Sequence, residues 1–108
     1  MNGQHVNSIF KKLPAYGDFG KKVRVICKDG FSVSMQASHL HYCTPRKDNA
    51  DYYEEFEIGF PSEPLPELAE WAEDQDYTGV FGYVPVEELA KVLETHGGVD
   101  FPATVAGK

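Results

Sequence analysis

The side chains best suited to chemistry gather in one short segment, where His39, His41 and Cys43 occupy alternate positions. If the segment is extended, all three project from one side, because alternate residues of a strand share a face. Two imidazoles and a thiolate are zinc ligands, and Cys27 on a neighbouring strand offers a fourth. The spacing differs from those of zinc fingers and ribbons. Ordinary strand or loop residues are therefore the favoured interpretation, and no metal or cofactor is expected.

The same cysteines and histidines raise the question of catalysis, since a thiol beside an imidazole can act as a nucleophile. The sequence contains no nucleophile elbow, phosphate-binding loop or H-E-x-x-H motif, so we expect no enzymatic activity. A Cys27–Cys43 disulfide is conceivable but disfavoured, because the chain starts without an apolar export signal and a reducing cytoplasm is the expected location. Two core cysteines are the preferred interpretation.

Acidic residues dominate the second half of the chain. Residues 1–47 carry a net charge of +6 and residues 48–108 a net charge of −13, which together give −7. Residues 48–90, the acidic stretch, contain thirteen carboxylates and neither Lys nor Arg, but several aromatic residues. A solvated acidic face is the plainer interpretation. Aromatic side chains rimmed by carboxylates also compose protein-binding surfaces.

The sharper hypothesis is that the acidic stretch docks on a basic host protein, such as a defence nuclease complex, with carboxylates in the places of nucleic-acid phosphates. An acidic chain argues against direct nucleic-acid binding, and no apolar run approaches the roughly 20 residues of a membrane span. The residues expected to carry the contact are Glu54, Glu55, Glu57, Glu70, Trp71, Glu73, Asp74 and Asp76.

Two alternating apolar runs flank Asp29 and Gly30 and predict a β-hairpin. A two-residue loop would pair Cys27 with Ser32 and split the apolar side chains between the two faces. A three-residue loop brings them to one face and requires a positive φ at Gly30. The predicted pairs are Cys27 with Phe31, Val25 with Val33 and Val23 with Met35.

Beyond the hairpin, residues 52–60 read as a strand with Phe56, Ile58 and Phe60 on one face. Apolar residues at helical spacing predict a helix over about 65–75, and a short strand follows over 80–84. A second helix starts after Pro85 and ends at two glycines, 97 and 98. A bulge near residues 37–38 is expected to turn Leu40 and Tyr42 inward, which leaves the histidines outside the core.

These elements predict an α+β fold, an antiparallel sheet of three to four strands with two helices on one face, in the order β-β-β-α-β-α. The expected organisation is a flexible N-terminal arm over residues 1–20, one α+β domain over 21–100 and a C-terminal tail over 101–108.

Five short segments of the sequence together carry a resemblance to known proteins: QASH at 36–39, YCTPR at 42–46, EIGFP at 57–61, GYVPV at 82–86 and HGG at 96–98. Over roughly residues 23–99 the chain resembles small proteins encoded by bacteriophages and prophages. The resemblance implies a phage accessory protein acting in the host cytoplasm, of the kind that blocks host defence, as anti-CRISPR and anti-restriction proteins do. It transfers no catalytic residue.

The leading hypothesis is therefore a non-enzymatic, acidic inhibitor that binds a host defence protein, by nucleic-acid mimicry. Two alternatives remain open. One is a small metal-binding or nucleic-acid-processing accessory that uses His39, His41 and Cys43 with Cys27. The other is a self-assembling protein, a homodimer or larger, whose sheet edge pairs with another copy.

Overall fold

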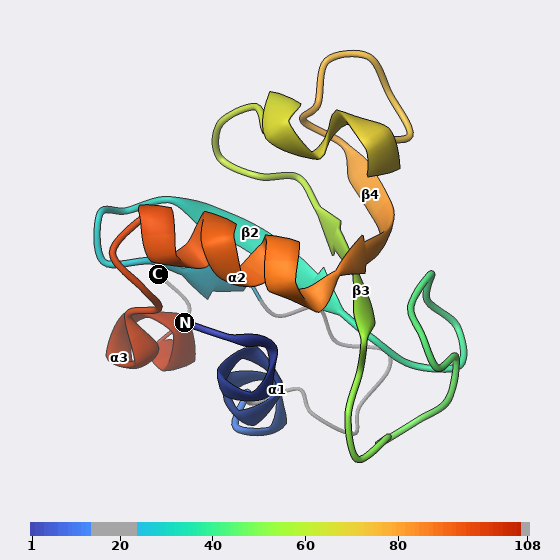
Figure 1. Ribbon diagram of the computed structural model, residues 1–108. Helices are drawn as coiled ribbons and strands as arrows, with labels where there is room; N and C mark the ends of the chain where they lie inside the picture. The colour runs from blue at the N-terminus through green and yellow to red at the C-terminus, as the bar shows by residue number, and fades with distance from the viewer. Residues whose placement is uncertain (14–23, 107–108) are drawn as a thin grey trace.

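The computed structural model describes residues 1–13 and 24–106, and these form an α+β fold on a four-stranded antiparallel sheet. The strands are β1 (Arg24–Ile26), β2 (Ser32–Gln36), β3 (Glu55–Gly59) and β4 (Val80–Pro85), side by side in chain order. The helices are α1 (Gly3–Lys11), α2 (Val86–Thr95) and α3 (Phe101–Ala106), with the 3₁₀ helix η1 (Pro66–Trp71). Figure 1 shows α2 lying across the sheet, α1 and α3 below it, and η1 above β4. The predicted fold class is confirmed.

The first hairpin has the predicted register. Val25 lies opposite Val33, and the Cys27 amide donates to the Phe31 carbonyl over 2.8 Å. The Gly30 amide donates to the Cys27 carbonyl, and the φ of Gly30 is +97°. The apolar side chains of both strands are buried as a result. The predicted pair of Val23 with Met35 lies outside the described residues.

The helix α2 supplies the main apolar cover of the sheet. Its buried residues recur at helical spacing, as the sequence predicted, and they are Val86, Leu89, Ala90, Val92 and Leu93. Glu87 and Glu88 lie in its first turn, where carboxylates interact favourably with the helix dipole. After the helix ends, Gly97 and Gly98 adopt φ values of +88° and +85°, and the Gly98 amide donates to the Leu93 carbonyl.

The N-terminal segment is a helix packed into the core, which corrects the flexible arm expected over residues 1–20. Asn2 caps α1, since its side chain accepts a hydrogen bond from the His5 amide over 2.9 Å. Val6, Phe10 and Leu13 are buried. Their spacing of four and three residues is the i, i+4, i+7 pattern of an amphipathic helix. Residues 14–20 lie outside the described residues.

The C-terminal segment is likewise docked, which corrects the tail expected over residues 101–108 for its described part. The buried Thr104 hydroxyl accepts a hydrogen bond from the Ile26 amide over 3.0 Å. The Asp100 amide donates to the Ile26 carbonyl over 2.8 Å. These contacts tie α3 and the turn before it to the edge strand β1.

Two further expectations need correction. The helix predicted over 65–75 is the short 3₁₀ helix η1, broken at Leu68 (φ −106°, ψ 23°). Phe60 was expected on the buried face of the third strand, but that strand ends at Gly59. Phe60 has a φ of +50° and is 56% exposed.

Both edges of the described sheet are occupied by the chain itself. Beside β1 lie Asp100 and Thr104, bonded to Ile26. Beside β4, the Glu73 amide donates to the Val80 carbonyl, and the Tyr83 amide donates to the Tyr42 carbonyl. Edge-to-edge pairing with a second copy would have to displace these hydrogen bonds, so the fold does not favour self-assembly through a sheet edge.

Candidate functional site

The most distinctive surface feature is a groove beside the outer edge of β4, which we call the aromatic groove. It is lined by Tyr42, Glu70, Trp71, Ala72, Glu73, Gly82 and Tyr83, and encloses about 350 Å³. Tyr42 is 43% exposed and Tyr83 is 40% exposed, and Trp71 is half-buried. Three aromatic side chains therefore share one open site, together with two carboxylates.

The groove exists because β4 carries a bulge. Phe56 pairs with Val84, but Ile58 pairs with Phe81, so Gly82 and Tyr83 both lie opposite Glu57. The extra residue reverses the alternation of β4 and turns the Tyr83 side chain to the surface. Tyr83 has a φ of +55°, a left-handed conformation that costs a non-glycine residue about 1 kcal/mol or more. A bulky aromatic in strained backbone is a feature found at functional sites.

Gly82 leaves room for Tyr42 to lie close against β4. A Cβ atom at position 82 would lie 3.1 Å from the Tyr42 Cβ and 3.6 Å from a Glu73 carboxylate oxygen. The first distance is shorter than normal packing allows without a shift of Tyr42. A small residue here therefore lets Tyr42 and Glu73 converge over the strand.

Tyr42 is held by contacts from several elements. Its amide donates to Glu57 Oε1 over 3.0 Å, and its carbonyl accepts from the Tyr83 amide over 2.9 Å. Its ring stacks on that of Tyr83, with 5.8 Å between centroids. The Arg46 guanidinium carbon lies 5.6 Å from the centre of the Tyr42 ring, within cation–π range. One ring of the groove lining thus already contacts a cation, although Arg46 itself does not line the groove.

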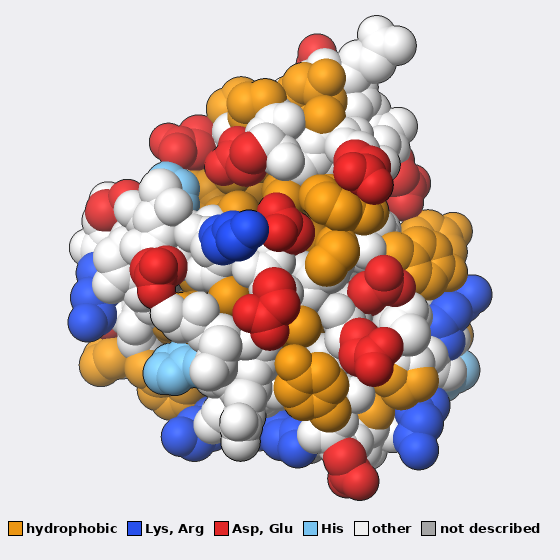
Figure 2. Space-filling view, viewed as in Figure 1, with side chains coloured by type: hydrophobic (Ala, Val, Ile, Leu, Met, Phe, Trp, Pro, Cys, Tyr) orange, Lys and Arg blue, Asp and Glu red, His pale blue; other side chains and the backbone are white. Residues whose placement is uncertain are grey.

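The electrostatic character of the groove is negative. Glu70 and Glu73 are exposed at its rim, and Glu57 contributes a half-exposed carboxylate beside Tyr42. Figure 2 shows that carboxylates on the α2 side of the molecule are spread among apolar side chains, whereas Lys and Arg gather mainly toward the lower and outer edges. On this face the acidic side chains are therefore dispersed among apolar ones and do not form one dense anionic block.

The structure brings together only part of the predicted contact set. Glu70, Trp71 and Glu73 line the aromatic groove, and Glu57 adjoins it. Asp74 and Asp76 lie in the turn after η1, where Asp74 Oδ1 accepts the amides of Asp76 and Tyr77.

The remaining two residues of that set do not line the groove. The exposed Glu54 offers its carbonyl to the Val86 amide at the start of α2. The half-exposed Glu55 accepts a hydrogen bond from the Thr44 hydroxyl over 2.5 Å. These two carboxylates belong to the wider acidic surface.

Four groove residues were absent from the predicted contact set: Tyr42, Ala72, Gly82 and Tyr83. The one visible signal was a glycine between two aromatic residues inside a predicted strand, which marks a bulge or a close backbone approach. Tyr42 was expected to turn inward with Leu40, and this was wrong. The Ser38 hydroxyl accepts the Leu40 amide over 3.0 Å, so the chain turns after β2. Leu40 is consequently 61% exposed.

The four candidate metal ligands are not brought together. Cys27 lies at the hairpin end of β2, opposite Phe31, whereas position 37 follows the other end of that strand. At about 3.3 Å per residue, six residues of strand separate these ends by roughly 20 Å. Among residues 1–13 and 24–106, no group of three or more His, Cys, Asp or Glu side chains is arranged to hold a metal ion.

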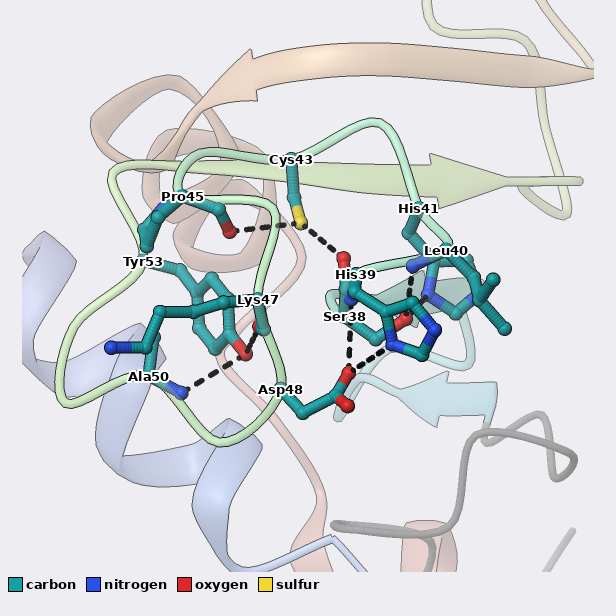
Figure 3. A network of polar contacts seen from close by, with 10 residues as sticks. All are labelled: Ser38, His39, Leu40, His41, Cys43, Pro45, Lys47, Asp48, Ala50 and Tyr53. Atoms are coloured by element: carbon teal, nitrogen blue, oxygen red, sulfur yellow. Dashed lines mark hydrogen bonds and ion pairs between the residues drawn. The ribbon is translucent and has the colours of Figure 1, made fainter.

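Figure 3 shows the polar contacts of the other three candidate metal ligands, His39, His41 and Cys43. His39 Nδ1 lies 2.7 Å from Asp48 Oδ1, and His41 Nδ1 lies 2.7 Å from Ser38 Oγ. The Cys43 thiol donates to the carbonyls of Ser38 and Pro45. These contacts fasten the loop between β2 and β3, and a hydrogen bond from the His39 amide, with the His39 ring, lowers the pKa of Asp48.

The two thiols are poorly suited to metal binding or nucleophilic attack. Both are free, and each is 1% exposed. Burial, assisted by the charge of Asp29, raises the pKa of Cys27 from 9.0 to about 11. Burial is also the main cause that raises the pKa of Cys43, against smaller opposing effects from the Ser38 backbone and Arg46. The thiolate, the reactive form, is thereby disfavoured at neutral pH.

We expect both thiols to resist alkylation in the folded protein at pH 8. For Cys27 the raised pKa alone lowers the thiolate population about 100-fold, and burial slows access further. Iodoacetamide labelling followed by mass spectrometry, with and without urea, measures this. Equal labelling rates with and without urea would contradict the expected burial.

The raised pKa also makes stability depend on pH, because the folded state favours the neutral Cys27 thiol. The contribution of this thiol to stability is complete below pH 9 and is lost as pH rises from 9.0 to about 11.

Comparison of the chain with protein-family models, with curated proteins and with solved structures found no match. No helix within the described part of the chain is long and apolar enough to cross a membrane.

Proposed function

We propose that this chain is a non-enzymatic binding protein that docks, through the acidic surface centred on the aromatic groove, onto a basic surface of another protein. The observation that carries the proposal is the groove itself: exposed tyrosines on strained or glycine-dependent backbone, with carboxylates around them. Aromatic anchors enclosed by polar residues are typical of energetic centres in protein interfaces.

The strain at Tyr83 supports a binding role over a purely structural one. A positive φ is adopted more easily by glycine than by tyrosine, and Tyr83 remains 40% exposed although its ring stacks on Tyr42. Contact with a partner would bury that ring and offset the strain. The buried thiols, with their raised pKa values, are consistent with a role that does not involve catalysis.

The finer form of the proposal is inhibition. A basic surface that accepts these carboxylates is the kind of surface that binds nucleic-acid phosphates, so docking would compete with nucleic acid. The resemblance to phage-encoded proteins makes a host defence nuclease, acting in the cytoplasm, the first partner to test. On this proposal the chain occupies the nuclease surface and carries out no chemistry itself.

The test starts with capture of partners by the tagged chain from bacterial lysate at low and high salt, identified by mass spectrometry. The purified partner is then measured against the double variant Glu70→Lys with Glu73→Lys. We expect this variant to bind about 100-fold more weakly, because two attractive contacts become repulsive. Wild-type chain should also displace nucleic acid from the partner, with an effect that weakens as salt rises.

The matched control is Asp51→Lys with Glu67→Lys, which makes the same charge change at exposed positions outside the groove. It should retain affinity within several-fold. If both double variants bind like wild type, the acidic docking surface is refuted. If both lose affinity equally, overall charge and not the groove controls binding.

A further inference from the structure

The chemistry of the aromatic groove points to a definite ligand group. We propose that the groove receives an arginine side chain of the partner, with the guanidinium against the rings of Trp71 and Tyr83 and hydrogen-bonded to Glu70 and Glu73. The inference rests on the proposed function and adds what the partner must present: an exposed arginine within an extended or protruding segment.

Charge complementarity is the first reason for a cationic occupant. The groove lining contains three aromatic rings and two carboxylates but no Lys or Arg. The faces of aromatic rings attract cations, and carboxylates at the rim add a directional acceptor. An anionic ligand such as a nucleic-acid strand could stack its bases here, but its phosphates would meet Glu70, Glu73 and the nearby Glu57.

The chain itself supplies the second reason. The guanidinium of its own Arg46 lies over the Tyr42 ring at 5.6 Å, and Tyr42 is one wall of the groove. Arg46 is exposed, so this position is not imposed by packing in the core. A guanidinium from the chain thus already occupies the kind of aromatic face that we assign to the partner's arginine.

Geometry favours arginine over lysine. The planar guanidinium can stack on an aromatic ring and donate two parallel hydrogen bonds to a carboxylate at the same time. An ammonium group is a more strongly hydrated point charge and cannot stack. The groove, with a volume of about 350 Å³, has room for the end of one long side chain.

The direct test titrates the chain with short glycine- and serine-flanked peptides that contain one arginine, one lysine or one citrulline. Trp71 is the only tryptophan of the chain, so its fluorescence reports on the groove, and amide NMR shifts at Gly82 and Tyr83 locate the binding. We expect the arginine peptide to bind at least about 10-fold more tightly than its neutral citrulline isostere, with lysine between them. Equal binding of arginine and citrulline would overturn the inference.

Variants make the test specific to the groove. Glu70→Gln with Glu73→Gln should weaken binding of the arginine peptide about 10-fold or more. Glu67→Gln, on the same 3₁₀ helix as Glu70, should not, because Glu67 does not line the groove. Tyr83→Gly removes the ring while relieving the positive φ, and circular dichroism of the variant separates a loss of binding from a loss of folding. Wild-type affinity in both groove variants would refute the proposed contacts.

Arg46→Gln separates a cationic ligand from an anionic one. Arg46 lies beside the groove on the Tyr42 ring and does not line it, so removal of its positive charge should tighten arginine binding about 2- to 5-fold. Weaker arginine binding by this variant, or a Trp71 response to a single-stranded oligonucleotide but not to the arginine peptide, would contradict the inference.

The two proposals fail in different ways. A captured partner that is lost on reversal of Glu70 and Glu73, together with no preference for arginine over citrulline, leaves the proposed function standing and removes the arginine inference. If the arginine peptide binds in the groove but no captured partner is lost on reversal of Glu70 and Glu73, the arginine inference stands and the proposed function is refuted.

Discussion

Phe10→Ala is expected to lower the free energy of unfolding by about 3–5 kcal/mol, the range for a buried phenylalanine truncated to alanine. Phe10 is 8% exposed, and its ring packs edge-on against Tyr53 at 5.6 Å and Phe56 at 5.2 Å. Truncation removes both aromatic contacts and leaves a cavity between α1 and the sheet. Thermal unfolding followed by circular dichroism should show a midpoint lower by about 15–25 °C.

The control for this variant is Gln4→Ala, an exposed position on the same helix. It should change stability by less than about 0.5 kcal/mol, since alanine is a good helix former and no core contact is lost. If Phe10→Ala were as stable as this control, α1 would not be docked as the structure has it, and residues 1–20 would be the arm expected from the sequence.

Asn7→Ala is expected to cost about 2–4 kcal/mol, because it leaves buried backbone groups without partners. The Asn7 side chain is 3% exposed and serves three backbone groups. Its Nδ2 donates to the carbonyls of Gly3 and Tyr53, and its Oδ1 accepts the Tyr53 amide over 2.7 Å. Without the amide, the N–H and C=O of Tyr53 must remain unpaired or admit water. Urea unfolding of the variant measures the loss.

Ser8→Ala is the matched control for Asn7, since Ser8 is the adjacent exposed residue of α1. A loss below about 0.5 kcal/mol in Asn7→Ala, equal to that of the control, would mean that water replaces the amide at little cost. A clear difference between the two variants would show that the hydrogen bonds of Asn7, and not helix propensity, attach α1 to the chain before β3.

Both variants act on the element that supports the candidate site. The Tyr53 backbone is hydrogen-bonded to the Asn7 side chain, and its ring packs against Phe10. The Tyr53 hydroxyl donates to the Lys47 carbonyl and accepts a hydrogen bond from the Ala50 amide. Through these contacts Tyr53 anchors the loop between β2 and β3 (Figure 3). That loop presents Tyr42 and Arg46. We therefore expect losses at α1 to reach the aromatic groove, although α1 contributes no side chain to it.

The sequence predicted well the elements whose signals are local. The hairpin register followed from the requirement that Val25 and Val33 share a face, and the structure confirms it. The limits of α2 followed from Pro85 and Gly97. In each case neighbouring residues carry the information, because turn geometry and side-chain periodicity act over a few positions. The helix α1 was not predicted although Val6, Phe10 and Leu13 have helical spacing, because the glycines and the proline among residues 1–20 indicate a loose segment.

By itself, then, the sequence determined an α+β chain with an acidic second half, and it named Glu70, Trp71 and Glu73 as candidates for contact with a partner. Only the tertiary structure decided that these residues meet Tyr42 and Tyr83. The pairing of β3 with β4 determines the bulge that turns Tyr83 outward, and the turn after Ser38 places Tyr42 beside it. Hydrogen bonds between segments remote in the sequence create this arrangement, and no local pattern of residues encodes which segments will pair.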